Sequence, residues 1–322
     1  MNHVVRHSFF SSLALSLFAA SLLSAQARAS FDSPSDPQSG SRATVEEVKS
    51  QTSPQAGAQA QTGQQQNSTF LQRFLAHTHD MGQIQPQSTT PFVIPDPRLV
   101  QYARFAVSHQ YTTTGTETVN YGSAHGGGII LYHRFQLDFA PPSYIVHNST
   151  VKDGSGDATL LVKWRVASSG PAHHNYVVTA DLAKSWTTGS YSNGSRTGIF
   201  TPIVATSKGF GNKFYVLSSI AGALPTGKIA KQGRTILWNE GVQYHPARWF
   251  WLDMENNATF YKGGSNDGKT QNFITPGFFY VLKPKSWSPT HPFFAFGEGM
   301  QIATSSFHSY NHNLISDFRF VF

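Results

Sequence analysis

The chain of 322 residues contains no cysteine. Disulfides and thiolate metal sites are therefore excluded as supports for its fold. Charge is also scarce, because only 13% of the residues are Asp, Glu, Lys or Arg, against roughly 25% in an ordinary soluble domain. Beyond residue 29 no apolar run approaches the roughly 20 residues that a membrane-spanning helix requires. If this chain crosses a membrane, it must do so with strands, since only helices and closed barrels satisfy their backbone groups in lipid.

Aromatic residues are plentiful instead, and they make up 13% of the chain, with 25 phenylalanines. Few charges, many aromatics and no long apolar run favour strands whose side chains alternate between an apolar and a polar face. The formal net charge is +7, but the basic residues form no stripe. We therefore do not expect a nucleic-acid partner.

The first 29 residues contain the three parts of a secretory signal peptide. Arg6 lies in a short polar start, Ser8–Leu23 is a nearly continuous apolar run, and Ala27-Arg28-Ala29 matches a cleavage site. The apolar run is too short for a retained transmembrane helix. We therefore predict that residues 1–29 are a signal peptide that is removed on export.

Residues 30–97 form a low-complexity region. Ser, Gln, Pro, Gly and Ala dominate as far as Gln64–Ser68, and such a composition cannot bury enough apolar surface to fold. The apolar residues between Phe70 and Leu75 have helical spacing, which predicts a short helix near 69–80. Three prolines after residue 90 then indicate an extended segment. We expect this region to be a disordered tail in the periplasm, and the folded domain to cover residues 98–322.

The last segment, Leu314–Phe322, alternates between two faces. One face carries the phenylalanines Phe318, Phe320 and Phe322. The other face carries Asp317 and Arg319, because a strand has a period of two. A final strand that ends in Phe resembles the assembly signal of bacterial outer-membrane β-barrels, so we expect the three phenylalanines to engage the barrel-assembly machinery. We also expect this strand to pair with the first strand and close the barrel.

Short segments of alternating polarity, separated by turn residues, continue throughout residues 98–322. The twelve predicted strands are Gln101–Tyr111, Ile129–Phe139, Tyr144–Ser149, Ala158–Ala167, Tyr176–Trp186, Pro202–Gly209, Phe214–Leu224, Thr235–Tyr244, Phe250–Tyr261, Gln271–Leu282, Phe293–Ala303 and Leu314–Phe322.

The connections between these strands alternate in length. Thr112–Gly128 and Thr187–Thr201 are long and polar, whereas Ala140–Ser143 and Phe210–Lys213 are tight. Long external loops, short periplasmic turns and two periplasmic termini are typical of bacterial outer-membrane barrels. The pattern predicts an all-β fold, namely a transmembrane antiparallel β-barrel, with twelve strands favoured over ten.

Mid-strand charges collect on one face of the predicted strands. In a soluble sandwich that face would be outside, whereas in a membrane barrel it lines the lumen. Aromatics at both ends of the apolar faces, such as Tyr176 and Trp186, favour the membrane barrel. The predicted lumen residues are Arg134, Asp138, Lys163, Arg165, Asp181, Asp253, Glu255, Asp317 and Arg319. They form either a selectivity constriction or ligand contact, or a network of paired charges that fills a narrow barrel, since unpaired buried charge is costly.

A hydrolytic function is a second interpretation. Outer-membrane phospholipase A is also a twelve-stranded barrel, and it uses a His-x-Ser pair that His147-Asn148-Ser149 resembles. His308-Ser309 is another adjacent pair. The Ser-Asn-Gly sequence that follows the histidine in that family stands elsewhere here, at Ser192-Asn193-Gly194, so we assign no catalytic residue. His77 and His79 would share one face of a strand, but scattered histidines explain such pairs, and we predict neither a metal site nor a cofactor.

Three features resemble an outer-membrane "transporter" family linked to phenol degradation (the MetA-pathway family). Gly156–Leu160 leads into a strand that contains Lys163-Trp164-Arg165, Leu224–Lys228 ends another strand, and the aromatic strand closes the chain. The resemblance covers about Tyr132–Phe322. It implies a barrel and the uptake of small hydrophobic or aromatic compounds, and it supplies no catalytic residues.

These observations favour a passive channel or transporter in the outer membrane. Its expected partners are outer-membrane lipid, the barrel-assembly machinery and a small-molecule solute. The alternatives are a lipid hydrolase of the phospholipase A type and a structural barrel whose external loops carry the function.

Overall fold

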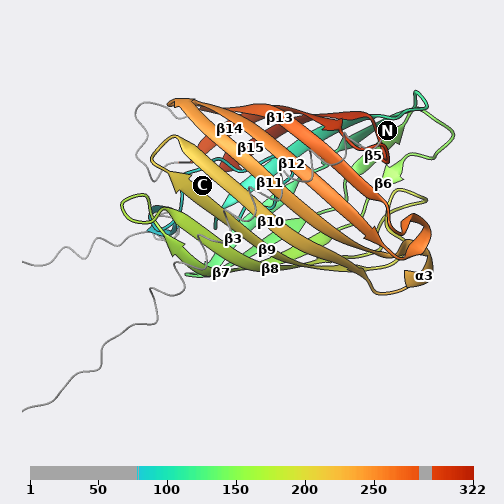
Figure 1. Cartoon of the computed structure of the whole chain (residues 1–322), viewed down its shortest axis with the longest axis horizontal. Coiled ribbons are helices and arrows are strands. Elements are labelled where there is room, and N and C mark those ends of the chain that lie inside the picture. The colour runs from blue at the N-terminus through green and yellow to red at the C-terminus, as the bar shows by residue number, and fades with distance from the viewer. Residues whose placement is uncertain (1–77, 79, 283–291) are drawn as a thin grey trace, which may run out of the picture. The chain divides into compact units, whose positions relative to one another are not determined.

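The computed structural model describes residues 78, 80–282 and 292–322, and the predicted signal peptide and most of the predicted tail lie outside these residues. The described part is an antiparallel sheet that closes on itself (Figure 1). Its strands are β1 (Tyr102–Tyr111), β2 (Glu117–Tyr121), β3 (Gly126–Tyr132), β4 (Phe135–Ala140), β5 (Tyr144–His147), β6 (Gly154–Ser155), β7 (Thr159–Ser169), β8 (Tyr176–Ser185), β9 (Ile199–Phe210), β10 (Phe214–Pro225), β11 (Arg234–Ala247), β12 (Phe250–Lys262), β13 (Thr270–Leu282), β14 (Phe293–Ala303) and β15 (His312–Val321). Two short helical turns, α3 (Ile229–Gln232) and η1 (Gly264–Asn266), lie in the loops that follow β10 and β12.

The wall of the barrel contains twelve strand positions, as predicted. Three of these positions are interrupted, so that β2 continues β3, β5 continues β4, and β6 continues β7. The barrel closes between β1 and β15, which pair from Tyr102 opposite Val321 to Tyr111 opposite His312. The predicted pairing of the first and last strands is therefore confirmed.

One predicted strand is wrong, although the count of twelve is right. Ile129–Phe139 is a hairpin, because β3 ends at Tyr132 and β4 begins at Phe135. The alternation of side chains continues through the two turn residues, and neither is Gly or Pro, so the turn leaves no sequence signal. The predicted loop Thr112–Gly128 contains β2, and the predicted turn Ala140–Ser143 interrupts a strand position instead. Pro141 and Pro142 cause that interruption, because proline cannot donate to the sheet.

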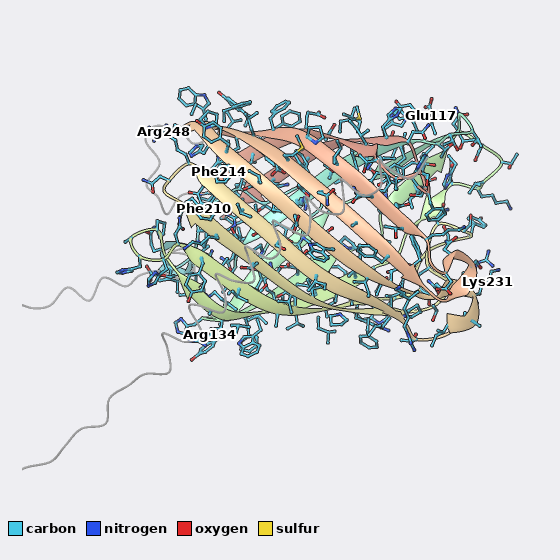
Figure 2. All side chains as sticks on the ribbon, viewed as in Figure 1. Glu117, Arg134, Phe210, Phe214, Lys231 and Arg248 are labelled. Atoms are coloured by element: carbon cyan, nitrogen blue, oxygen red, sulfur yellow. The ribbon has the colours of Figure 1, made fainter. Side chains whose placement is uncertain are left out.

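The apolar side chains of the wall point outward. Phe105, Val204 and Phe318 are 47%, 51% and 50% exposed, whereas Asp317 is completely buried. This is the opposite of a soluble sandwich and the arrangement expected of a membrane barrel. In Figure 2 side chains project from the whole outer surface, with Phe210, Phe214, Arg134 and Arg248 at the end that carries the short turns. Within the described ranges, no helix has both the length and the apolar character needed to cross a bilayer.

Candidate functional site in the lumen

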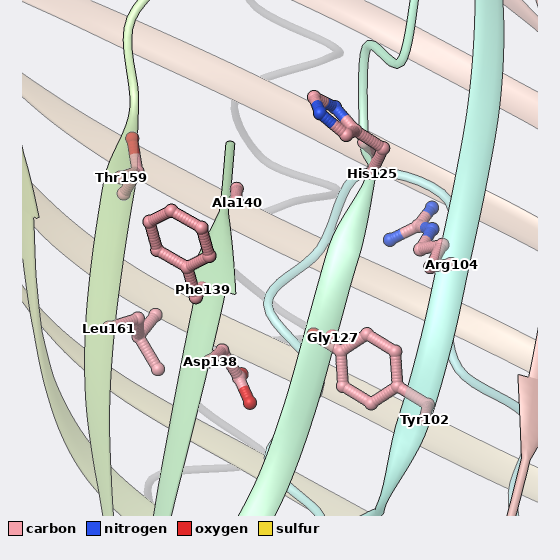
Figure 3. Close-up of a pocket in the computed structure, with 10 residues that line it drawn as sticks. Tyr102, Arg104, His125, Gly127, Asp138, Phe139, Ala140, Thr159 and Leu161 are labelled. Atoms are coloured by element: carbon pink, nitrogen blue, oxygen red, sulfur yellow. The ribbon is translucent and has the colours of Figure 1, made fainter. Parts of the chain in front are cut away.

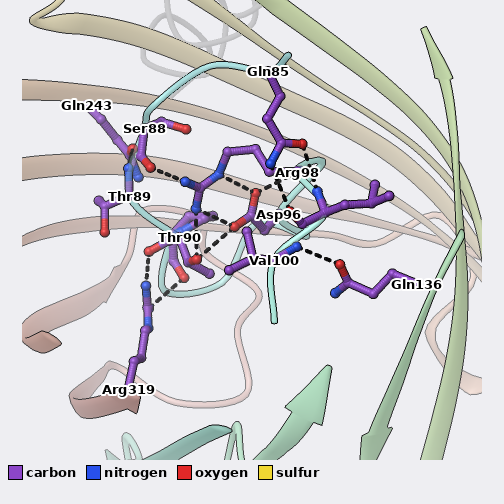
Figure 4. A network of polar contacts seen from close by, with 12 residues as sticks. Gln85, Ser88, Thr89, Thr90, Asp96, Arg98, Val100, Gln136, Gln243 and Arg319 are labelled. Carbon is purple, nitrogen blue, oxygen red and sulfur yellow. Dashed lines mark hydrogen bonds and ion pairs between the residues drawn. The ribbon is translucent and has the colours of Figure 1, made fainter. Parts of the chain in front are cut away.

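Residues 80–101 lie inside the barrel, and we call them the luminal segment. Thr78 and residues 80–83 are helical, and the chain then runs through the lumen without joining the sheet (Figure 4). The segment forms hydrogen bonds with side chains of β1, β4, β7, β11, β12 and β15. The boundary drawn at residue 98 is therefore corrected, since residues 80–97 belong to the barrel domain.

Glu255 on β12 binds the middle of the luminal segment. Its carboxylate accepts hydrogen bonds from the backbone N–H groups of Phe92 at 2.5 Å, Val93 at 3.0 Å and Ile94 at 2.8 Å. The side chain is only 1% exposed. Hydrogen bonds that involve a charged group are roughly twice as strong as neutral ones, so a carboxylate that accepts from three consecutive residues attaches the segment firmly to β12.

Two arginines bind the carbonyl groups next to this point. Arg319 donates to the carbonyls of Thr90 and Pro91, and Arg104 donates to the carbonyl of Phe92 at 2.9 Å. Both guanidinium groups also contact Asp317, and the Arg104 Nη2 atom lies 2.7 Å from Asp317 Oδ2. A carboxylate between two guanidinium groups compensates their buried charge.

The far side of the segment is bound by β4 and β7. Lys163 Nζ donates to the carbonyls of Asp96 at 2.7 Å and Arg98 at 3.1 Å, and it lies 3.8 Å from Asp138 Oδ2. The backbone N–H of Val100 donates to the Gln136 side chain at 2.6 Å. The segment is thus held from opposite walls of the lumen.

The luminal segment also has an internal ion pair that shapes its bend. Arg98 Nη2 lies 2.6 Å from Asp96 Oδ2, and Arg98 also donates to the Thr90 hydroxyl and the Ser88 carbonyl. Burial alone would raise the pKa of Asp96, but the Arg98 guanidinium lowers it to about 2. The carboxylate is therefore charged at neutral pH, and the bend carries its own counter-ion.

Phe92 anchors the segment by packing. Its ring stacks on Phe279 with 4.1 Å between ring centroids. A Cβ atom at Gly277 would lie 2.4 Å from the Phe92 ring, and one at Gly299 would lie 3.2 Å from it. The two glycines on β13 and β14 therefore leave the space that the ring occupies.

The structure places eight of the nine predicted lumen residues on the inner side of the wall. Those eight are Asp138, Lys163, Arg165, Asp181, Asp253, Glu255, Asp317 and Arg319. Arg134 is the exception, because it is exposed in the turn between β3 and β4. Its predicted position in the lumen is wrong because the prediction treated this turn as the middle of a continuous strand. A role of the eight residues in selectivity stays a prediction.

Two of these acids differ from the others in their surroundings. Within the described residues, the carboxylate oxygens of Asp181 and Asp253 are buried and accept no hydrogen bond. Asp181 is the register partner of Lys163 on β7. Asp253 precedes Glu255 by two residues on the same face of β12. These two carboxyl groups therefore lie in the wall of the lumen without a hydrogen bond to the luminal segment.

Sequence reasoning missed Arg104 and the partners in the luminal segment. Arg104 lies on the inner face of β1, between Ala103 and Phe105, and the alternation along this strand could have revealed it. The partners of Glu255 lie 161 to 163 residues away in the sequence, and no local pattern predicts so distant a contact.

A cavity of about 210 Å³ is lined by residues of β1, β3, β4 and β7 and of the loop before β3 (Figure 3). Its lining is mixed, with Arg104, His125 and Asp138 among the polar groups and Leu161 and Phe139 among the apolar ones. Its volume is sufficient for a small organic molecule or several waters.

The two His–Ser pairs considered for a hydrolase do not form the contacts that hydrolysis requires. The ring nitrogens of His147 contact Thr118 Oγ1 at 3.1 Å and Asn193 Oδ1 at 2.6 Å, and those of His308 contact the Ser305 carbonyl and Asn311. A histidine that activates a serine must lie within hydrogen-bond reach of its hydroxyl. Neither arrangement favours the phospholipase interpretation.

No protein-family model and no curated protein matches the chain by sequence. Among solved structures, the chain is similar to an outer-membrane channel from Pseudomonas putida F1, with a TM-score of 0.51 and 13% identity over 73% of this chain and 100% of that chain. The NanC porin has a TM-score of 0.44 and 10% identity over 68% of this chain and 98% of that chain. The DcaP channel of Acinetobacter baumannii has a TM-score of 0.31 and 8% identity over 69% of this chain and 96% of that chain. The first likeness confirms the fold of an outer-membrane β-barrel.

Proposed function

We propose that the protein is a passive outer-membrane channel for small solutes, and that its own luminal segment narrows the pore. This proposal rests on one observation, namely that the luminal segment, and not only wall side chains, occupies the lumen. A barrel of about eight strands is narrow enough to be filled by its wall side chains alone, whereas this wall contains more strand positions and encloses a wider lumen. Here a separate stretch of chain occupies the lumen and is attached by hydrogen bonds and one aromatic stack, so it can shift without opening the wall.

The solute class follows from the cavity and from the family resemblance. The cavity of about 210 Å³ combines Arg104 and His125 with apolar side chains, which suits a small molecule with one polar end. The resemblance carried by Gly156–Leu160 and Leu224–Lys228 points to small hydrophobic or aromatic compounds. In the structure these two motifs have structural roles, because Asp157 accepts the backbone N–H groups of Gly189 and Ser195, and Thr226 donates its N–H to Gly198.

Single-channel recording in planar bilayers tests the proposal. We expect the wild-type protein to conduct weakly, and Glu255→Gln to raise conductance or open probability several-fold, because a neutral amide binds the three backbone N–H groups less strongly. Glu298→Gln is the matched control, since Glu298 lies on the outer face of β14 and contacts Ser316. Uptake of phenol and of a sugar of similar size into proteoliposomes would then compare the solute classes.

A deletion of residues 81–97 gives an independent measurement. We expect a larger conductance from this variant, provided that its heat-modifiable mobility on gels shows a folded barrel. If wild type, Glu255→Gln and the folded deletion variant all fail to conduct above an empty-detergent control, the protein is a structural barrel and not a channel.

A further inference from the structure

Basic side chains are concentrated in two neighbouring loops at the end of the barrel opposite the short turns. The loops follow β10 and β12, and with their flanking strand ends they cover residues 226–234 and 262–269. They contain five basic residues and one acid, namely Lys228, Lys231, Arg234, Lys262, Lys269 and Asp267. The other loops at that end contain only two basic residues and three acids, counted over residues 112–117, 148–158, 186–198 and 304–311. Positive charge at this end therefore lies beside β10, β11 and β12.

Two of these cations face each other across neighbouring strands. Arg234 and Lys262 are direct register partners on β11 and β12. The next register pair on the same face is Ile236 with Phe260, and Ile236 is exposed on the outer surface of the wall. Because side chains alternate along a strand, Arg234 and Lys262 also point outward, and both are exposed. The two cations therefore lie on the outer surface, where the apolar wall ends.

The pair of Arg234 and Lys262 is unfavourable on its own. Like charges directly opposite each other destabilise a sheet. Across the described ranges, neither side chain takes part in an ion pair. The acid nearest to Lys262 in the sequence is Asp267, and its carboxylate accepts the backbone N–H of Gly263 at 2.7 Å. A negatively charged group from outside the chain would relieve the repulsion between the two cations.

The packing of the two loops brings a third cation to this pair. A Cβ atom at Gly233 would lie 2.3 Å from the carbonyl oxygen of Gly263, so backbone contacts backbone where the loops meet. Both glycines have a φ of 70°, which suits them to these turns. Lys231 is exposed in the first loop and lies at this end of the barrel (Figure 2). We call Lys231, Arg234 and Lys262 the basic rim.

Exposed apolar side chains adjoin the basic rim on the outer surface of the barrel. Ile236 on β11 and Leu224 on β10 are exposed, and so is Phe200, the register partner of Leu224 on β9. In barrels of this class the longer loops lie outside the cell, so the basic rim lies at the outer boundary of the membrane. Cations next to an apolar surface suit a lipid that has both an anionic head group and acyl chains.

We propose that the basic rim binds the phosphate groups of lipid A, the phosphorylated glycolipid of the outer leaflet. An arginine presents a planar set of donors that matches a phosphate, and a lysine adds a mobile positive charge. Clusters of such residues at a membrane surface attract anionic head groups. A phosphate between Arg234 and Lys262 neutralises the like-charged pair, while the acyl chains of the same lipid lie along Ile236 and Leu224. The site requires a barrel in the outer membrane, but it does not require that the barrel conducts.

Binding of lipid A to the protein refolded in detergent, measured by native mass spectrometry, tests the site. The rim variant combines Arg234→Gln with Lys262→Gln. The matched control combines Lys213→Gln with Arg248→Gln, which removes two exposed positive charges from the turns at the other end of the barrel. We expect the rim variant to bind lipid A several-fold more weakly than the wild type, and the control to bind it equally well. Lipid A without its phosphates should bind the wild type as weakly as intact lipid A binds the rim variant.

Heat-modifiable mobility on gels gives a second measurement. In lipid-free detergent, we expect the rim variant to keep its folded form to at least the wild-type temperature, because the like-charged pair is gone. Lipid A should raise this temperature for the wild type and for the control, and it should leave the rim variant unchanged. A purely structural role of the two cations would instead lower the temperature of the rim variant without lipid.

Four results would overturn the proposal. Equal binding of lipid A by the wild type and the rim variant would show that the lipid attaches elsewhere. An equal loss of binding in the control would show that only the net charge matters. Undiminished binding of lipid A without phosphates would show that the acyl chains alone attach it. A less stable rim variant in lipid-free detergent would show that the two cations support the loops. None of these measurements depends on conductance, so the site can be tested independently of the channel.

Discussion

Asp317 connects the closure of the barrel with the occupation of its lumen. Arg104 and Arg319 are direct register partners on β1 and β15, and like charges opposite each other destabilise a sheet. Asp317 contacts both guanidinium groups, which in turn hold carbonyls of the luminal segment. The Arg319 guanidinium also lies 4.4 Å from the centre of the Phe279 ring. One buried carboxylate thus allows two arginines to lie opposite each other where β1 pairs with β15 and to hold the luminal segment at the same time.

The residue-scale prediction concerns this carboxylate. Asp317→Asn leaves two buried guanidinium groups without their counter-ion, and removing one partner of a buried pair typically costs about 3–5 kcal/mol. We expect a lower unfolding temperature, measured as the loss of the fast-migrating folded form on gels with increasing temperature. Glu298→Gln removes an outward carboxylate instead and should shift that temperature much less. Equal shifts for both variants would contradict the role given to Asp317.

The luminal segment shows where sequence-based prediction succeeds and where it fails. Alternation along β12 and β15 correctly places the charges of these strands on the inner face, because a strand's period is a local property. Nothing local indicates that Phe92 and Ile94, set among prolines, enter the barrel. Their partners are Glu255 and Phe279, so the information lies in contacts between distant parts of the chain. The turn at Arg134 was missed for a different reason. There the local alternation of side chains continues through the turn between β3 and β4, so the sequence looks like one unbroken strand.

Phe92 provides the prediction at the scale of the element. Phe92→Ala removes the stack on Phe279 and empties the space beside Gly277 and Gly299, so the segment should be held less tightly. We expect a higher open probability in planar bilayers. Val93→Ala is the control from the same segment, because the Val93 side chain is 38% exposed and should leave the recording unchanged. An identical effect of both substitutions would mean that the ring does not anchor the segment.

At the scale of the molecule, the two ends of the barrel differ. Figure 2 places Phe210, Phe214, Arg134 and Arg248 at one end, and Glu117 and Lys231 at the other. The first end carries short turns, such as the one between β9 and β10, and the second carries the longer loop between β8 and β9. Barrels of this class direct short turns to the periplasm. The luminal segment leads into β1 at the end where the final strand terminates, since the backbone N–H of Phe322 donates to the carbonyl of Gln101.

This asymmetry predicts the orientation of the chain in the membrane. Thr114 lies in the loop between β1 and β2, and Asn212 lies in the turn between β9 and β10; both are exposed. Because the chain contains no cysteine, Thr114→Cys and Asn212→Cys each introduce one reactive thiol. We expect a membrane-impermeant maleimide to label Thr114→Cys on intact cells and Asn212→Cys only after the outer membrane is opened. The reverse pattern would place the short turns outside the cell. Labelling of both variants on intact cells would contradict the prediction that the two ends of the barrel lie on opposite sides of the outer membrane.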